Sequence, residues 1–206
     1  MTRAFAHAFD YARDGRHVDL HWAFGAHVSY RIDYDAIFER REVFCLGGCE
    51  MAVLADEDVL HFQLLGMFED LARGTARLRA FVDLYRILVE LDGSVGWHEF
   101  WRLRREERTF GVCRSALWVF LSLFGGEGPF EHPAAAAGVP SPDLSRAARL
   151  VEARPGSFAN KAWAAACYEC PRALSAAWWL VSLPHRLAVY QPGIRRQRLA
   201  LRRRPA

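Results

Sequence analysis

Residues 17–22 read His-Val-Asp-Leu-His-Trp, and they hold the side chains whose types and spacing best suit chemistry. His17, Asp19 and His21 alternate with apolar residues, which predicts a half-buried strand with all three polar side chains on one face. A carboxylate in the middle of a strand sits on a rigid support. Two histidines and a carboxylate are also a ligand set for a transition metal. Same-face residues lie roughly 6.5–7 Å apart along a strand, however, which strains a single coordination sphere.

Four of the five cysteines form two closely spaced pairs, and such pairs can bind zinc. Cys45 and Cys49 flank a Gly-Gly turn, so they could face each other across it. Cys167 and Cys170 lie in an apolar helical context, where a free cysteine is an ordinary small core residue. We therefore predict four buried or half-buried thiols in preference to a zinc site.

Asp33 and Asp35 have the spacing of a paired metal-binding motif, but the start of a helix accounts for both. Asp33 precedes a helical pattern with Ile37 and Phe38 on its inner face, so it is placed to cap that helix. Asp35 lies in the first turn, where the helix dipole favours an acid.

From residue 42 the pattern passes from strand to helix. Residues 42–54 predict a two-stranded hairpin, because Gly47-Gly48 can supply the positive φ of a tight turn. Asp56 is then expected to cap a helix that stops near Gly74. The helices predicted next cover residues 76–91, 97–108 and 109–124, and the inner stripe of the first is expected to hold Leu78, Phe81, Val82, Tyr85 and Leu88 or Val89.

Residues 128–142 are rich in Ala, Pro and Gly and predict a linker, followed by short helices over residues 143–153, 163–168 and 174–183. The last dozen residues contain six arginines and no acid: Arg195, Arg196, Arg198, Arg202, Arg203 and Arg204. Without these six, 21 basic residues face 24 acidic ones, so the body of the chain is acidic. An acidic body argues against a broad nucleic-acid-binding face.

The order of these elements, from the strand at 17–22 through the helix start at 32–40 and the hairpin to the helix led by residues 54–61, resembles a known family. It is similar to the C-terminal half of the uncharacterised nucleotidyltransferase family, within the polymerase-beta-like superfamily, over roughly residues 16–124. The resemblance implies transfer of a nucleotidyl group with divalent metals held on three carboxylates. Asp19 matches the single later acid of that set, His21 a supporting residue, and Asp83 an acid that organises the helical lobe. The alternative for Asp19 is an acid that only solvates the outer face of a half-buried strand, and the alternative for Asp83 is a plain surface acid.

The chain departs from the family pattern at its start. The family places a Gly-Ser turn and an Asp-x-Asp pair ahead of the Asp19 position, and neither occurs upstream of Arg16. One carboxylate cannot assemble a two-metal site, so Mg²⁺ is expected only if the missing carboxylates are supplied. We expect a truncated or degenerate member, whose incomplete sheet promotes self-association or needs a partner chain. The helix that contains His61 also departs from the family pattern, which has several histidines along this helix.

Composition bounds the class of protein. The chain has 206 residues, 52% of them hydrophobic and 25% charged, which suits one domain, with or without a small partner lobe, around a real core. Five cysteines in a chain this long do not indicate a secreted disulfide scaffold. The first residues contain no signal-peptide run, and the longest apolar stretch, residues 173–183, is shorter than the roughly 20 residues that span a bilayer. We therefore predict a cytoplasmic protein with no membrane contact.

Together these patterns predict an α+β fold. Residues 1–54 would form a partial nucleotidyltransferase-like sheet and a hairpin, residues 55–190 a mostly helical lobe, and residues 191–206 a basic, disordered tail. Three hypotheses remain open: an incomplete nucleotidyltransferase that uses an NTP, a non-catalytic helical binding or scaffold module, and a nucleic-acid-binding protein that acts through its arginine-rich tail. The acidic body disfavours the third.

Overall fold

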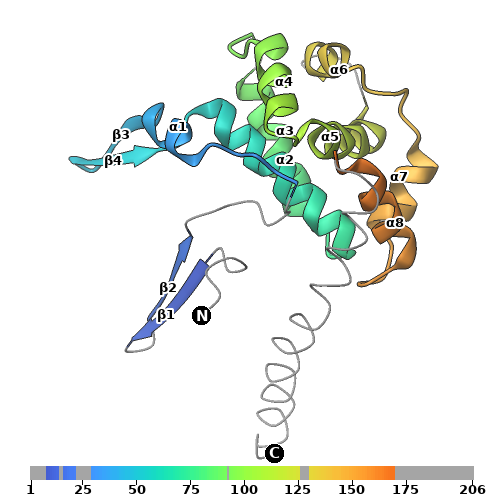
Figure 1. Ribbon diagram of the computed structural model, residues 1–206, viewed down its shortest axis with the longest axis horizontal. Coiled ribbons are helices and arrows are strands. Elements are labelled where there is room, and N and C mark those ends of the chain that lie inside the picture. The colour runs from blue at the N-terminus through green and yellow to red at the C-terminus, as the bar shows by residue number, and fades with distance from the viewer. Residues whose placement is uncertain (1–7, 14–15, 22–28, 92, 126–129, 170–206) are drawn as a thin grey trace, which may run out of the picture. The chain divides into compact units, whose positions relative to one another are not determined.

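The computed structural model describes residues 8–13, 16–21, 29–91, 93–125 and 130–169, which all belong to one unit, Met1–Glu169 (Figure 1). In chain order the elements are β1 (Ala8–Arg13), β2 (Arg16–His21), α1 (Tyr34–Glu39), β3 (Glu42–Leu46), β4 (Cys49–Val53), α2 (Asp56–Arg73), α3 (Leu78–Glu90), α4 (Trp97–Glu106), α5 (Phe110–Phe124), α6 (Glu131–Ala137), α7 (Leu144–Val151) and α8 (Phe158–Cys167). The fold is α+β, as predicted. The predicted helix at 174–183 and the basic tail lie outside the described residues.

The strands form two antiparallel hairpins, β1–β2 and β3–β4. The predicted strand at 17–22 is confirmed over residues 17–21 as part of β2, and Trp22 lies outside the described residues. Its partner β1 was not expected. In β3–β4 the turn is made by Gly47 and Gly48, with φ of 58° and 81°, as their sequence indicated. Within the described residues each hairpin is a sheet of two strands, so one edge of β2 has no ladder partner there.

Helix α1 is short and is positioned by its cap. The carboxylate of Asp33 accepts a hydrogen bond from the backbone N–H of Ala36 at 3.1 Å, which confirms the predicted cap. Ile37 is fully buried, but Phe38 is exposed, so the expected inner face is wrong for Phe38.

Helix α2 is the centre of the helical lobe, and it packs against α3, α5 and α8 (Figure 1). It ends at Gly74, whose left-handed backbone (φ 70°) caps the helix as predicted. Its start differs from the expectation by one residue, because Ala55 occupies the N-cap and Asp56 is already helical. An acid in the first turn is still favoured by the helix dipole.

Helix α5 is the second element of the core and is buried over most of its surface. It contacts α4, α6, α7 and α8 in addition to α2. The fully buried large side chains of the lobe come from α2, α3, α4 and α5 and include Leu60, Leu64, Phe68, Leu84, Phe100, Trp101 and Phe120. These positions follow a helical period, which is why the helices themselves were predictable.

Helix α3 buries a different stripe from the one expected. Phe81, Leu84 and Leu88 face the core, and of the predicted inner residues only Phe81 and Leu88 are among them. Leu78, Val82, Tyr85 and Val89 are exposed. The helix is apolar on two adjacent stripes, so its period predicted a helix but could not decide which stripe faces inward.

The predicted linker at 128–142 contains a helix, α6, and that prediction is wrong for residues 131–137. A run of four alanines favours a helix. Pro133 stands in the first turn, where a missing backbone N–H costs nothing. Gly138, with φ 58°, ends the helix in a left-handed cap.

Helices α7 and α8 close the lobe. The carboxylate of Asp143 caps α7 by accepting from the N–H of Arg146 at 2.9 Å. On α8, the buried amide of Asn160 donates to the carbonyls of Leu71 at 2.6 Å and Leu150 at 2.8 Å. Because these carbonyls lie in the last turns of α2 and α7, Asn160 satisfies acceptors that a helix end leaves open. No helix in the described part of the chain is long and apolar enough to cross a membrane.

Candidate functional site

Asp19 lies in the middle of β2, and its register partner on β1 is Asp10. Directly opposed residues of an antiparallel pair share one face of the sheet. The same face carries the positions of His17 and His21, whose partners are Ala12 and Ala8. The hairpin thus brings a second acid to the predicted position of the metal-binding carboxylate.

Sequence reasoning missed Asp10. The family motif is an Asp-x-Asp pair on one strand, whereas this pair is formed across two strands. The signal was present in the sequence, since Asp10 stands between Phe9 and Tyr11, shortly before an Asp-Gly pair at residues 14–15 of the kind that favours a hairpin. Phe9 and Tyr11 partner Leu20 and Val18 on the opposite face, so the alternation of β1 matches that of β2.

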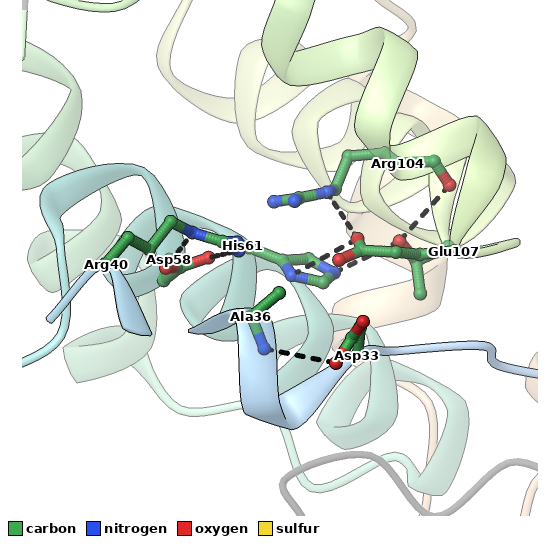
Figure 2. A network of polar contacts seen from close by, with 8 residues as sticks. Asp33, Ala36, Arg40, Asp58, His61, Arg104 and Glu107 are labelled. Atoms are coloured by element: carbon green, nitrogen blue, oxygen red, sulfur yellow. Dashed lines mark hydrogen bonds and ion pairs between the residues drawn. The ribbon is translucent and has the colours of Figure 1, made fainter. Parts of the chain in front are cut away.

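A second polar cluster lies at the junction of α1, α2 and α4. Arg40, just after α1, makes a two-point contact with Asp58 of α2, with N–O distances of 2.7 and 2.6 Å (Figure 2). The Asp58 side chain is 1% exposed and that of Arg40 is 38% exposed. The hydrogen bond to Asp58 raises the pKa of Arg40. The buried carboxylate of Asp58 therefore has a partner that still reaches solvent.

His61 lies one turn further along α2 and is fully buried. Its Nε2 is 3.1 Å from the Thr109 hydroxyl, and its Nδ1 is 3.8 Å from a carboxylate oxygen of Glu107 (Figure 2). Burial, followed by the positive charges of Arg104 and Arg40, holds the pKa of His61 well below 6.5. The imidazole is therefore neutral at neutral pH, and its contact with Glu107 is not an ion pair there.

Arg104 and Glu107 complete this buried cluster. The Arg104 side chain is buried, with its Nε 2.7 Å from Glu107 and its guanidinium 4.8 Å from the centre of the Phe100 ring. Burial raises the pKa of Glu107, and the charges of Arg104 and Arg40 oppose that rise. Thr109 donates to the Arg104 carbonyl at 3.4 Å. Because the Thr109 hydroxyl gives its proton to the Arg104 carbonyl, its oxygen can only accept a hydrogen bond from His61. We therefore assign the Nε2–H tautomer to His61.

This cluster is suited to positioning rather than to catalysis. It joins the start of the helical lobe to the end of α4, and its groups are turned toward one another. Sequence reasoning missed it for a physical reason: Asp58 has a sufficient local explanation as a first-turn acid. The partners of Asp58 and His61 are distant in sequence, so no local pattern links them. The only local signal was the three-residue spacing of Arg104 and Glu107.

Asp83 lies on the surface of α3. It is 3.4 Å from the Nε of Arg79, in an ion pair between side chains that are 43% and 89% exposed. It also lines a shallow depression between α2 and α3, together with Gln63 and Arg73. This placement agrees with the surface-acid alternative, and an organising role for Asp83 stays a prediction.

The cysteines differ from the expectation. Cys45 and Cys49 are exposed on the β3–β4 hairpin, so the prediction of buried or half-buried thiols is wrong for both. Their register partners are Glu50 and Leu46, so they do not face each other. Cys167 is partly buried, and Cys170 lies outside the described residues. Across the described residues no three His, Cys, Asp or Glu side chains are grouped to hold a metal.

The helical lobe contains a cavity of about 550 Å³ between α5, α7 and α8. Its lining residues include Arg114, Arg146, Trp118 and Trp163. The Arg146 guanidinium lies 5.3 Å from the centre of the Trp118 ring. Two acids, Asp143 and Glu169, also reach the cavity, but Asp143 caps α7 and Glu169 accepts from the backbone N–H of Gly111 at 2.8 Å.

The fold and these sites define an α+β protein in which a two-stranded hairpin with two opposed aspartates precedes a helical lobe in the chain. The family described as an uncharacterised nucleotidyltransferase matches residues 2–125, more than half of the 206 residues. The chain belongs to this family. The match starts before Arg16, where the resemblance was expected to begin, and so includes β1 and Asp10. No curated protein and no solved structure matches the chain significantly.

Proposed function

We propose that this chain takes part in nucleotidyl transfer, in which an acceptor hydroxyl displaces pyrophosphate from the α-phosphate of a nucleoside triphosphate. Membership of the family supports the class of reaction. The observation that carries the residue assignment is the register of β1–β2, which sets Asp19 opposite Asp10 on one face.

The two aspartates fit one Mg²⁺ ion rather than two. Mg²⁺ commonly binds through one or two carboxylates, with substrate phosphates and water completing its shell. On the shared face of β1–β2 the remaining positions are Ala8, Ala12, His17 and His21, so these strands offer no third acid. A second ion would require carboxylates from a partner chain or from another part of the protein.

Asp19 would hold the metal and help to activate the acceptor hydroxyl, with Asp10 as the opposing ligand. When bound, Mg²⁺ neutralises charge on the triphosphate and on the oxygen that leaves with pyrophosphate. His21, two positions along the same face, would support Asp19. The shared face of β1–β2 carries two acids, which are enough for one ion but not for two. We therefore expect the chain alone to bind Mg²⁺–ATP or Mg²⁺–GTP only weakly.

The test of this function uses the full chain isolated from its native host, so that any bound partner is retained. It is incubated with α-labelled nucleoside triphosphates, Mg²⁺ and three acceptor sources: small molecules, proteins and RNA. We expect Mg²⁺-dependent transfer of label to one source. Asp19→Asn should reduce it by at least the roughly 10–100-fold that loss of a supporting metal-site residue costs.

Asp35→Asn is the matched control, because Asp35 is an exposed aspartate in the first turn of α1. It should leave transfer unchanged. Equal transfer by the wild-type chain and Asp19→Asn, or no transfer to any of the three sources, would contradict the proposed function.

A binding role for the helical lobe is a second candidate, favoured by the cavity of about 550 Å³. Among the described residues, neither Arg114 nor Arg146 forms an ion pair. Arg146 lies beside the Trp118 ring and Arg114 beside the Phe110 ring. Guanidinium groups beside aromatic faces suit an anionic, aromatic small molecule. Nucleoside monophosphates should raise the melting temperature of the wild-type chain. The shift should disappear in Arg114→Ala/Arg146→Ala and persist in Arg149→Ala; no shift in the wild type would reject this role.

A further inference from the structure

Helix α3 carries a row of exposed apolar side chains beside the stripe that it buries. Leu78 is 73% exposed, Val82 and Tyr85 are each 44% exposed, and Val89 is 42% exposed. Their spacing of four, three and four residues is that of the seam between two packed helices. The row runs almost the whole length of α3, Leu78–Glu90. We call these four residues the α3 seam.

A charged residue follows each member of the α3 seam, and the signs alternate. Arg79, Asp83, Arg86 and Glu90 therefore line one flank of the seam in the order plus, minus, plus, minus. Asp83 is partly exposed and the other three are exposed. Among the described residues the only ion pair within this set is the surface contact between Arg79 and Asp83 at 3.4 Å. Exposed pairs of this kind contribute little to stability.

We propose that the α3 seam binds a second copy of this chain, with the two α3 helices antiparallel about a two-fold axis near Leu84. In that arrangement Leu78 meets Val89 of the other copy, and Val82 meets Tyr85. The charged flank then meets itself with opposite signs throughout: Arg79 lies opposite Glu90, and Asp83 opposite Arg86. Each pair occurs twice, as a two-fold interface requires.

The charge pattern is the reason to propose a second, antiparallel copy of this chain as the partner. An antiparallel pair brings the same flank of both helices together, whereas a parallel pair brings opposite flanks together. Only the antiparallel pair matches each arginine of the flank with an acid. An unrelated partner would need no such self-complementary order along thirteen residues of one helix.

The proposed interface is small. A stable protein interface buries about 800 Å² on each partner, and one stripe of a helix roughly 20 Å long supplies less. We therefore expect a dissociation constant in the micromolar range that weakens as salt rises. Tyr85 is partly fixed before association, because its ring packs edge-on against Phe130 with centroids 5.5 Å apart. This interface is independent of nucleotidyl transfer and of the strand edges of the hairpins.

Sedimentation equilibrium on two single charge reversals and their mixture tests the proposal. In a dimer of Arg79→Glu, the new glutamate lies opposite Glu90 of the other copy, so two acids repel. In a dimer of Glu90→Arg, the new arginine lies opposite Arg79 of the other copy, so two arginines repel. Each variant alone should dimerise at least tenfold more weakly than the wild type. An equimolar mixture should form a heterodimer about as strong as the wild-type dimer, because the acid introduced in one variant then meets the arginine introduced in the other. Within one chain these two positions are roughly 16 Å apart, so rescue can occur only between chains.

The apolar side of the seam is tested separately. Val82→Glu should abolish dimerisation, whereas Leu144→Glu, at an exposed leucine of α7, should leave it unchanged. Circular dichroism melts serve to show that every variant is folded. A monomeric wild type at 1 mM, or single variants that fail to complement each other when mixed, would overturn the proposal.

Discussion

The contact between Arg40 and Asp58 is asymmetric, because only Asp58 is shut off from water. Removing Arg40 leaves a buried carboxylate without its partner, which typically costs about 3–5 kcal/mol. Removing Asp58 leaves an arginine that can turn to solvent. We therefore predict that Arg40→Ala lowers the free energy of unfolding by about 3 kcal/mol and that Asp58→Ala lowers it by clearly less. Urea denaturation measures both, with the exposed neighbour Arg41→Ala as control. Equal losses for the two variants would contradict the asymmetry.

His61 makes stability depend on pH in a defined direction. Its folded pKa lies well below its unfolded value of 6.5, so the unfolded state binds more protons as the pH falls below 6.5. The free energy of unfolding must then decrease as the pH is lowered from 7 to 5.5, by about 1 kcal/mol from this residue. The raised pKa of Glu107 acts in the opposite direction, because the folded state then holds its proton more tightly.

The measurement is therefore a comparison of variants. His61→Gln should lose less stability than the wild type between pH 7 and 5.5, by about 1 kcal/mol. His98→Gln, at an exposed histidine of α4, should behave like the wild type. Identical pH profiles for the wild type and His61→Gln would show that His61 is not buried in its neutral form.

At this scale the sequence predicted residues whose role is local. The cap at Asp33 and the strand position of Asp19 follow from patterns of a few neighbours. Asp10 was missed because its relation to Asp19 is one of register between strands. Asp58 was missed because its partner Arg40 lies 18 residues away. A local pattern predicts on which face of a helix or strand a side chain lies. It does not predict which distant residues that face contacts.

At the scale of elements, the close approach of α5 to α8 depends on one glycine. A Cβ at Gly111 would collide with the backbone carbonyl of Cys167. Backbone cannot move as a flexible side chain can, so Gly111→Ala should force the two helices apart. We predict a loss of about 1–3 kcal/mol in the free energy of unfolding, the usual cost of overpacking a well-packed contact.

Gly66→Ala is the matched control for this variant. Gly66 is an exposed helical glycine on α2, and a Cβ there would meet nothing within 4 Å. That substitution should be neutral or raise stability by up to about 1 kcal/mol, because alanine favours the helix. Thermal melts of both variants check the pair. A Gly111→Ala variant as stable as Gly66→Ala would contradict the packing of α5 on α8.

The boundaries of the helices could be predicted where the helical period was strong. The prediction was wrong where it rested on composition alone. Helices α2, α4 and α5 lie close to their expected ranges. The Ala, Pro and Gly content of the segment that contains α6 predicts a linker. Alanine nevertheless favours a helix, and Pro133 stands in the first turn, where proline is tolerated. For α3 the period was correct and the inward stripe was not, since apolar residues occupy two neighbouring stripes.

At the scale of the whole molecule, charge separates a basic tail from an acidic body. Six arginines lie between residues 195 and 204. The rest of the chain has 21 basic and 24 acidic residues, so its net charge is negative. We predict that deleting residues 195–206 removes weak, salt-sensitive binding to any polyanion and leaves the melting temperature nearly unchanged. Fluorescence titrations with RNA, DNA and heparin at low and physiological salt measure this. A sequence-specific complex that survives physiological salt and is lost with the tail would instead favour a nucleic-acid-binding function.

The central claim is that Asp19 and Asp10 hold a divalent metal with a nucleotide on the β1–β2 hairpin. The most direct measurement is paramagnetic broadening of backbone amide resonances when Mn²⁺ and a nucleoside triphosphate are added, because it locates even weak binding. The account predicts selective broadening at Ala8–Arg13 and Arg16–His21 that Mg²⁺ reverses. The broadening should be lost in Asp19→Asn and kept in Asp35→Asn. Broadening centred on other elements, or unchanged in Asp19→Asn, would contradict the account.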